Sequence, residues 1–246
     1  MKIPKYISPD RIKNAFVEVR YTTKIPFEIA VGLFYQSLDE SYFYTSRPLG
    51  GKQVDLPINS PQNLKILVNQ PLFYNDKIKI EFQPNSIIFN CLNEYISWKK
   101  YKPEIIKALT QLTKAKVIER YTRIGLRYIS EYPNIDLRNC VKFSFTFGMP
   151  EINSETYSFR SEFKVNDLKV ILNLNNHLPI ANSKGATNEI TITPTSSIDI
   201  DVIMDNMDVK DLKIILTNID MIHDKEKEIF FTLLKEQFIE TLNPIY

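Results

Sequence analysis

The 246-residue sequence contains little cysteine, glycine and histidine, and it has no long apolar run. Two cysteines, Cys91 and Cys140, are too few for a disulfide framework and fit a reducing compartment. The six glycines are dispersed, and the Gly-Gly-Lys-Gln run at 50–53 lacks the first glycine and the Ser or Thr of a phosphate loop. No stretch approaches the roughly 18 apolar residues of a membrane helix, and the start has no apolar signal segment. We therefore expect a cytoplasmic protein that is not inserted in a membrane.

The chemistry of metal sites and nucleophiles is also poorly represented. Two histidines, His177 and His223, occur without His-Glu-x-x-His spacing, and there is no Gly-x-Ser-x-Gly elbow. We therefore expect no catalytic residue, no metal and no cofactor, and we favour a non-catalytic protein. One hypothesis stays open, because Glu151, Glu162 and Lys164 imitate the carboxylates and lysine of a magnesium-dependent nuclease. A cross-strand pair on the protein surface is the alternative explanation for Glu162 and Lys164.

What the sequence does contain is enough apolar material for a folded core. Apolar residues make up 43% of the chain, charged residues make up 24%, and the net charge is only +2. This composition argues against disorder and against a uniformly basic coat for nucleic acid. The length fits one or two domains of about 150 residues each.

Apolar residues recur with a period of two in some segments and about 3.6 in others, which predicts strands and helices in alternation. In the first half we expect a strand at 15–21, a helix opening with Pro26 and a strand at 42–45. A long loop at 46–71 follows, with a helical turn at 61–68, and then a hairpin with turns at 75–76 and 84–85 and a helix starting near Pro103.

In the second half we expect strands at 118–130, 141–147, 156–165, 168–174, 190–193 and 198–203. We also expect a helical remnant at 136–139, a loop at 175–188, a short helix at 212–216 and a closing helix from about Asp224. The two halves, residues 1–116 and 117–246, thus follow a similar order. The predicted fold class is α+β, with two related βαβββα halves whose curved antiparallel sheets each pack on a long amphipathic helix.

Four short segments and three single residues show similarity to other sequences: residues 14–21, 83–90, 122–129 and 199–204, with Trp98, Tyr101 and His223. At these positions the chain resembles a sporadically distributed bacterial family of uncharacterised proteins of about this length. The resemblance implies the fold and the length but no reaction. The patchy distribution of that family suggests an accessory role in a mobile or defence-linked operon.

Two predicted strands carry charged residues on their less apolar faces. Arg123 and Arg127 lie on one face with Gly125 between them, which leaves room for a ligand or partner group beside the backbone. Glu18 and Arg20 on the first strand are expected to occupy a neighbouring position of the sheet. These four charged side chains are our candidate binding surface, and a cross-strand Glu–Arg ladder that joins the two halves is the alternative.

Three aromatic residues are further candidates for contact with a partner. Trp98, the only tryptophan, and Tyr101 lie ahead of the helix predicted near Pro103. Trp98 either covers the core with its N–H at the edge or forms an interaction hot spot. His223 is expected just before the closing helix, where it either packs at the helix entry or acts as a catalytic or sensing histidine.

Charge is distributed unevenly along the chain. Residues 99–127 carry nine basic side chains against two acidic ones, a balance of +7, with Tyr101 and Tyr121 among them. Residues 195–246 carry eleven acidic side chains against five lysines, a balance of −6. The basic aromatic stretch would suit nucleic acid, but we favour contact with acidic surface inside the protein or in a homodimer.

The combined pattern favours a cytoplasmic, non-catalytic binding protein. Its partner is predicted to be another protein or a small ligand, and self-association is expected. A nucleic-acid-binding accessory factor that uses residues 99–127 is the alternative function, and a magnesium-dependent nuclease is the third.

Overall fold

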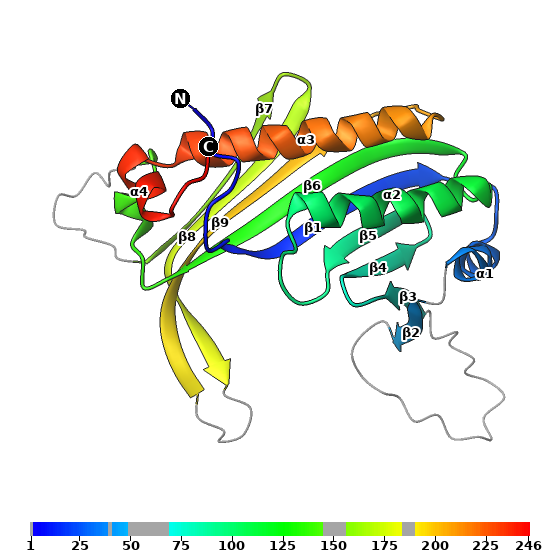
Figure 1. Cartoon of the computed structure of the whole chain (residues 1–246), viewed down its shortest axis with the longest axis horizontal. Helices are drawn as coiled ribbons and strands as arrows, with labels where there is room; N and C mark the ends of the chain where they lie inside the picture. The colour runs from blue at the N-terminus through cyan, green and yellow to red at the C-terminus, as the bar shows by residue number, and fades with distance from the viewer. Residues whose placement is uncertain (1, 39–40, 49–68, 145–155, 184–189) are drawn as a thin grey trace. The chain divides into compact units, whose positions relative to one another are not determined.

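The computed structural model describes residues 2–38, 41–48, 69–144, 156–183 and 190–246. Within these ranges the chain forms an α+β fold with a nine-stranded sheet and four α-helices (Figure 1), which confirms the predicted α+β class and the antiparallel sheet. The strand order is β2-β3-β4-β5-β1-β6-β9-β8-β7. Antiparallel register is found in the pairs β2–β3, β3–β4, β4–β5, β6–β9, β9–β8 and β8–β7.

The elements alternate between strands and helices along the chain. The strands are β1 (Ile12–Thr22), β2 (Phe43–Pro48), β3 (Asn69–Tyr74), β4 (Ile78–Gln83), β5 (Ser86–Cys91), β6 (Arg120–Pro133), β7 (Tyr157–Val165), β8 (Leu168–Ser183) and β9 (Ile190–Met204). The helices are α1 (Phe27–Ser37), α2 (Trp98–Lys114), α3 (Leu212–Leu233) and α4 (Glu236–Thr241), with a short 3-10 helix, η1 (Leu137–Asn139).

The chain divides into two compact units, each built from separate stretches of sequence. Unit 1 comprises Met1–Phe16, Ile124–Asn206 and Leu216–Tyr246. Unit 2 comprises Val17–Arg123 and Met207–Ile215. The division passes through β1, β6 and α3, so neither unit is one continuous half of the sequence.

Unit 2 has a core formed by strands with alternating burial and by one face of α2. In β4, Ile78, Ile80 and Phe82 are fully buried and the residues between them are half-buried. This alternation follows from the two-residue period of a strand with one face in the core. Helix α2 begins five residues before Pro103, at Trp98, because the amides of Lys100 and Tyr101 donate to the Ser97 carbonyl. The residues that α2 buries recur at helical spacing: Tyr101, Glu104, Ile105, Ala108, Leu109 and Leu112.

Helix α3, which the division between the units crosses, is longer than the sequence analysis predicts. The short helix expected at 212–216 and the closing helix expected from Asp224 form one helix that runs to Leu233. Ile219 and Ile222 are buried in the stretch that was expected to separate the two helices. Tertiary burial of this apolar stripe outweighs the local capping preference of Asp224, which lies inside the helix.

The loop predicted at 175–188 is also wrong for its first part. Strand β8 continues through that segment to Ser183, and β9 is one continuous strand rather than two. Two other expectations fall largely outside the described residues. These are the 61–68 helical turn with the Gly-Gly-Lys-Gln run before it, and the strand at 141–147, of which Val141 forms one isolated bridge with Leu234.

Among the described residues, no helix has both the length and the apolar character that crossing a membrane requires.

Candidate binding surface

In unit 2, the structure brings together three of the four charged side chains predicted to form a surface. Arg20 Nε donates to Glu18 Oε1 at 2.9 Å, and Arg123 Nη1 donates to Glu18 Oε2 at 2.5 Å. Glu18 lies on β1 and Arg123 on β6, which are neighbouring strands in the sheet. The arrangement matches the cross-strand Glu–Arg ladder, because both oxygens of the carboxylate are engaged within the chain. Arg20 is half-exposed and is the most accessible of the three.

The fourth predicted residue, Arg127, forms a separate contact in unit 1. Its guanidinium donates two hydrogen bonds to Asp199, from Nε to Oδ1 at 2.8 Å and from Nη2 to Oδ2 at 2.7 Å. Asn173 Nδ2 donates to the same Oδ2 at 2.9 Å. These contacts raise the pKa of Arg127 above its ordinary value, chiefly through the hydrogen bonds that it donates to Asp199. Asp199 is buried beneath this fork of two hydrogen bonds.

The polar contacts continue from Asn173 toward the edge strand β7. Arg160 Nη1 donates to Asn173 Oδ1 at 3.3 Å, and Arg160 also pairs with Glu162. Lys169 Nζ lies 2.8 Å from Glu162 Oε2, and its hydrogen bond is the largest of the effects that lower the Glu162 pKa. Together these residues form a ladder of neutralised charges across β6, β9, β8 and β7.

The nuclease hypothesis gains no geometric support from this ladder. Glu162 faces two cations, an arrangement that suits a surface ion pair, and Lys164 is exposed on the same strand. Glu151 lies outside the described residues. Within those residues, no group of three His, Cys, Asp or Glu side chains could hold a metal ion.

The two predicted aromatic candidates at the start of α2 differ in accessibility. Trp98 is half-buried and packs edge-on against Tyr101, with ring centroids 6.1 Å apart. Tyr101 is completely buried, and burial raises the pKa of its hydroxyl well above the ordinary value. Tyr101 is therefore a core residue of unit 2 rather than part of a binding surface.

His223 lies in the middle of α3, not before a helix as predicted. Its ring packs edge-on against Tyr128 at 6.1 Å, and its Nδ1 lies 3.1 Å from Asp224 Oδ1. Burial lowers the pKa of His223, which favours the neutral imidazole despite the neighbouring carboxylate. The structure thus gives His223 a packing role in unit 1.

The arginines of the basic stretch are already paired within the chain. Arg120 pairs with Asp208 in unit 2, and Arg127 pairs with Asp199 in unit 1. Both carboxylates belong to the acidic segment 195–246. Basic and acidic segments therefore pair within the chain at these two contacts, as our preferred explanation of the uneven charge predicts. The exposed lysines of the stretch lie near the two ends of α2, at positions 99, 100, 114 and 116.

A different feature of unit 1 extends beyond its other strands, and sequence reasoning missed most of it. The pairing of β6 with β9 ends at Thr195, and the pairing of β7 with β8 ends at Asn176. Strands β8 and β9 continue to pair with each other, from Leu178–Thr195 to Ser183–Ile190. We call this two-stranded ribbon, residues 178–183 and 190–195, the arm (Figure 1).

The arm is uncharged and exposes apolar side chains. Its twelve residues include no Asp, Glu, Lys or Arg. Ile192 is 67% exposed, which is the largest value for any large hydrophobic side chain in the described part of the chain. Pro179 and Pro194, which face each other across the ribbon, are exposed as well. An apolar, uncharged strand pair of this kind is typical of a segment that contacts another protein.

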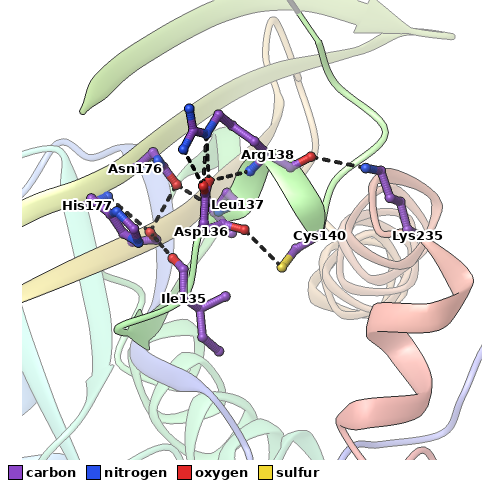
Figure 2. Close-up of polar contacts among 9 residues, drawn as sticks. Ile135, Asp136, Leu137, Arg138, Cys140, Asn176, His177 and Lys235 are labelled. Atoms are coloured by element: carbon purple, nitrogen blue, oxygen red, sulfur yellow. Dashed lines mark hydrogen bonds and ion pairs between the residues drawn. The ribbon is translucent and has the colours of Figure 1, made fainter. Parts of the chain in front are cut away.

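The root of the arm is fixed by buried side chains at a bulge in β8 (Figure 2). Asn176 is fully buried, and its Oδ1 accepts a hydrogen bond from the Leu137 amide at 2.7 Å. Ser196 Oγ donates to the Ile135 carbonyl at 2.5 Å and accepts from the His177 amide at 3.1 Å. His177 has φ 50°, and its Nε2 is buried without a hydrogen-bond partner among the described residues. The extra residue of the bulge thus redirects β8 while the side chains hold it in place.

The neighbouring polar groups at the root are structural rather than reactive. Asp136 accepts from the Arg138 guanidinium, and this contact is the main reason that the Asp136 pKa is lowered. Cys140 Sγ donates to the Asp136 carbonyl at 3.3 Å, and burial raises the thiol pKa to about 11. A thiol with this pKa is protonated at neutral pH and is a poor nucleophile. Lys235 Nζ donates to the Arg138 carbonyl at 3.0 Å and joins the root to the start of α4.

No protein-family model matches the chain, and no curated protein matches it. The function is therefore inferred from the geometry of the described residues.

Proposed function

We propose that this chain is a cytoplasmic, non-catalytic binding protein that contacts a partner protein through the arm. The observation that carries the proposal is the continuation of β8 and β9 past both neighbouring strands as an uncharged ribbon with exposed Ile192. A two-stranded ribbon is only marginally stable in water, and its edges present backbone groups that can pair with another strand. Addition of a partner strand satisfies these groups and covers apolar surface.

The register of the arm determines which backbone groups point outward. Pro179 and Pro194 pair across the ribbon, and proline has no N–H, so this pair is not hydrogen-bonded across the ribbon. In agreement, the Pro194 carbonyl accepts from the Asn134 amide of the neighbouring chain segment at 2.8 Å. Because inward and outward groups alternate along a strand, the N–H and C=O of Ile192 also point outward. The N–H and C=O of Thr193, by contrast, point into the ribbon.

The buried root prepares the arm for binding. Asn176 and Ser196 hold the base of the ribbon through hydrogen bonds to residues 135–137. A strand that is held in its bound direction loses less conformational entropy when a partner binds. The root therefore supports a binding role without supplying any chemistry of its own.

The alternative function, nucleic-acid binding by residues 99–127, receives less support. Arg120, Arg123 and Arg127 each pair with a carboxylate of the chain, whereas phosphate-based affinity takes about 6–10 contacts on one surface. RNA or DNA binding that weakens steeply with salt and is lost in Arg123→Glu would favour this alternative. An accessory role in a mobile or defence-linked operon stays a prediction from the family resemblance.

We also propose that the chain consists of two related βαβββα halves. Both halves follow the order strand, helix, strands, long helix, with η1 in place of the early helix in the second half. The first half has four strands after α1, one more than this pattern, and the second half has three after η1. The neighbouring positions of β1 and β6 in the strand order support this proposal, since the first strands of two related units often pair.

The binding function can be tested with three forms of the full-length protein. Wild type, Ile192→Val and Ile192→Pro are immobilised and exposed to extract from the native host. Valine preserves a β-branched apolar side chain, whereas proline removes the outward N–H and leaves the ribbon's internal hydrogen bonds intact. We expect a specific protein to be retained by wild type and Ile192→Val and lost from Ile192→Pro. Retention of the same proteins by all three forms would contradict the proposal.

A further inference from the structure

The arm has features that suit a second copy of itself as its partner. None of its twelve residues carries a formal charge, so two arms can approach without like-charge repulsion and without needing an oppositely charged surface. The run Ile190-Thr191-Ile192-Thr193 consists of β-branched residues, which favour strand pairing. The strand carries no lysine or glutamate that would protect its edge from pairing with an identical strand.

The structure also indicates where on β9 another strand has room. The Asn134 amide already donates to the Pro194 carbonyl, so the segment after β6 occupies the position beside Pro194. Beyond this point, toward the tip of the arm, Ile192 and Ile190 have no neighbouring strand on that side among the described residues. An incoming strand must therefore align with Ile190–Ile192 and stop before Pro194.

We propose that two copies of the chain associate by antiparallel pairing of their β9 edges, with the twofold axis at Thr191. This inference rests on the proposed function and names the partner. In this register, Ile192 of each copy lies opposite Ile190 of the other, and each such pair exchanges two backbone hydrogen bonds. The contact is isologous, so it closes as a dimer, and the occupied position beside Pro194 limits how far the strands slide.

The register makes a specific prediction for engineered cysteines. At the twofold axis, the two Thr191 residues form a non-hydrogen-bonded pair with Cα atoms about 4.5 Å apart, which a disulfide can span. In Thr193→Cys, the two cysteines would be four residues apart along the paired strands, about 13 Å, which a disulfide cannot span. The native Cys91 and Cys140 are buried and do not compete for oxidation.

We expect mild oxidation to link Thr191→Cys into a covalent dimer and to leave Thr193→Cys unlinked. We also expect sedimentation velocity to show concentration-dependent dimers for wild type and Ile192→Val, and monomers for Ile192→Pro. Equal cross-linking of both cysteine variants would overturn the register, and a wild-type protein that is monomeric at all concentrations would overturn the dimer. In the monomeric case, partner capture that still depends on Ile192 would leave the proposed function standing with another protein as partner. A wild-type protein that neither forms dimers nor captures a partner through Ile192 would refute the proposed function as well.

Discussion

Glu104 is a buried carboxylate that ties α2 to the turn between β3 and β4, and its removal should destabilise unit 2. The carboxylate accepts hydrogen bonds from Lys77 Nζ at 2.8 Å, Tyr42 Oη at 3.0 Å and Asn75 Nδ2 at 3.2 Å. Glu104 is 8% exposed and Asn75 is also buried, so water cannot replace these contacts freely. The perturbation of choice is Glu104→Gln, which keeps the volume of the side chain and removes its charge.

The expected cost can be worked out from these three contacts. Hydrogen bonds to a charged group contribute about 1.5–3 kcal/mol each, and the two from Tyr42 and Asn75 are largely shielded from water. The Lys77 side chain is about half exposed, so its ion pair contributes only about 0.5–1 kcal/mol. The glutamine side chain keeps one acceptor oxygen, so it can still accept some of the hydrogen bonds that Glu104 accepts. We therefore expect Glu104→Gln to lower the free energy of unfolding by about 2–3 kcal/mol.

The pH dependence of this effect has a definite sign. Burial raises the pKa of Glu104, but the hydrogen bonds from Lys77, Tyr42 and Asn75 outweigh it, and the net shift is downward from 4.5. The stabilisation is therefore fully present above the unfolded-state pKa and is lost as the pH falls through the folded-state value. The difference between wild type and Glu104→Gln should be constant from pH 6 to 8 and should shrink below about pH 4.5.

The assay is urea unfolding followed by tryptophan fluorescence. Trp98 is the only tryptophan and lies on α2, so it reports on unit 2. Glu94→Gln is the matched control, because Glu94 is exposed, and it should change stability by less than about 0.5 kcal/mol. A loss below about 0.5 kcal/mol for Glu104→Gln, or a loss that grows as the pH falls, would refute the reasoning.

Three further predictions concern unit 1. Asn176→Ala leaves the buried Leu137 amide without its partner and should cost about 2–3 kcal/mol in chemical unfolding. Asp199→Asn removes the charge that receives the Arg127 fork and should cost about 1–2 kcal/mol, less than a fully buried pair because Arg127 is 44% exposed. Glu226 is buried, and its pKa is raised well above 4.5, chiefly by burial. The contribution of Glu226 to wild-type stability should therefore fall as the pH rises above about 4.5, and Glu226→Gln should remove that contribution, so the variant should gain relative to wild type at pH 8.

Each of these predictions has a clear opposite outcome. An Asn176→Ala protein as stable as wild type would show that the root of the arm does not depend on this amide. An Asp199→Asn protein as stable as wild type would show that the contact between Arg127 and Asp199 contributes no more than an exposed surface ion pair. A Glu226→Gln protein that is relatively more stable at pH 5 than at pH 8 would show that this carboxyl group is ionised in the folded state.

The sequence correctly predicts those elements in which the local pattern of apolar residues agrees with their burial in the structure. The alternation of Ala15, Val17 and Val19 places β1 correctly, because these residues are all buried on one face of that strand. The expected proximity of the first strand to Arg123 is found in the Glu18–Arg123 contact. Such elements are predictable because local pattern and tertiary environment favour the same structure.

The arm and its root are less predictable because they depend on contacts between distant residues. Asn175 and Asn176 are typical of a loop, yet Asn176 accepts its hydrogen bond from Leu137, 39 residues away, and β8 continues beyond it. Asp199 receives Arg127 from 72 residues away. The run of β-branched residues at 190–193 predicts a strand. Only the end of the β6–β9 pairing at Thr195 shows that, among the described residues, no strand pairs with this run on the side away from β8.

The most direct test of the account is hydrogen exchange at the backbone amides of Ile192 and Thr193 as a function of protein concentration. The Thr193 amide, which points into the ribbon, should stay protected at all concentrations. The Ile192 amide, which points outward, should exchange freely in dilute protein and become protected as two arms pair or as a partner from the host binds. An Ile192 amide that remains unprotected at high concentration and in the presence of host extract would contradict a binding role for the arm.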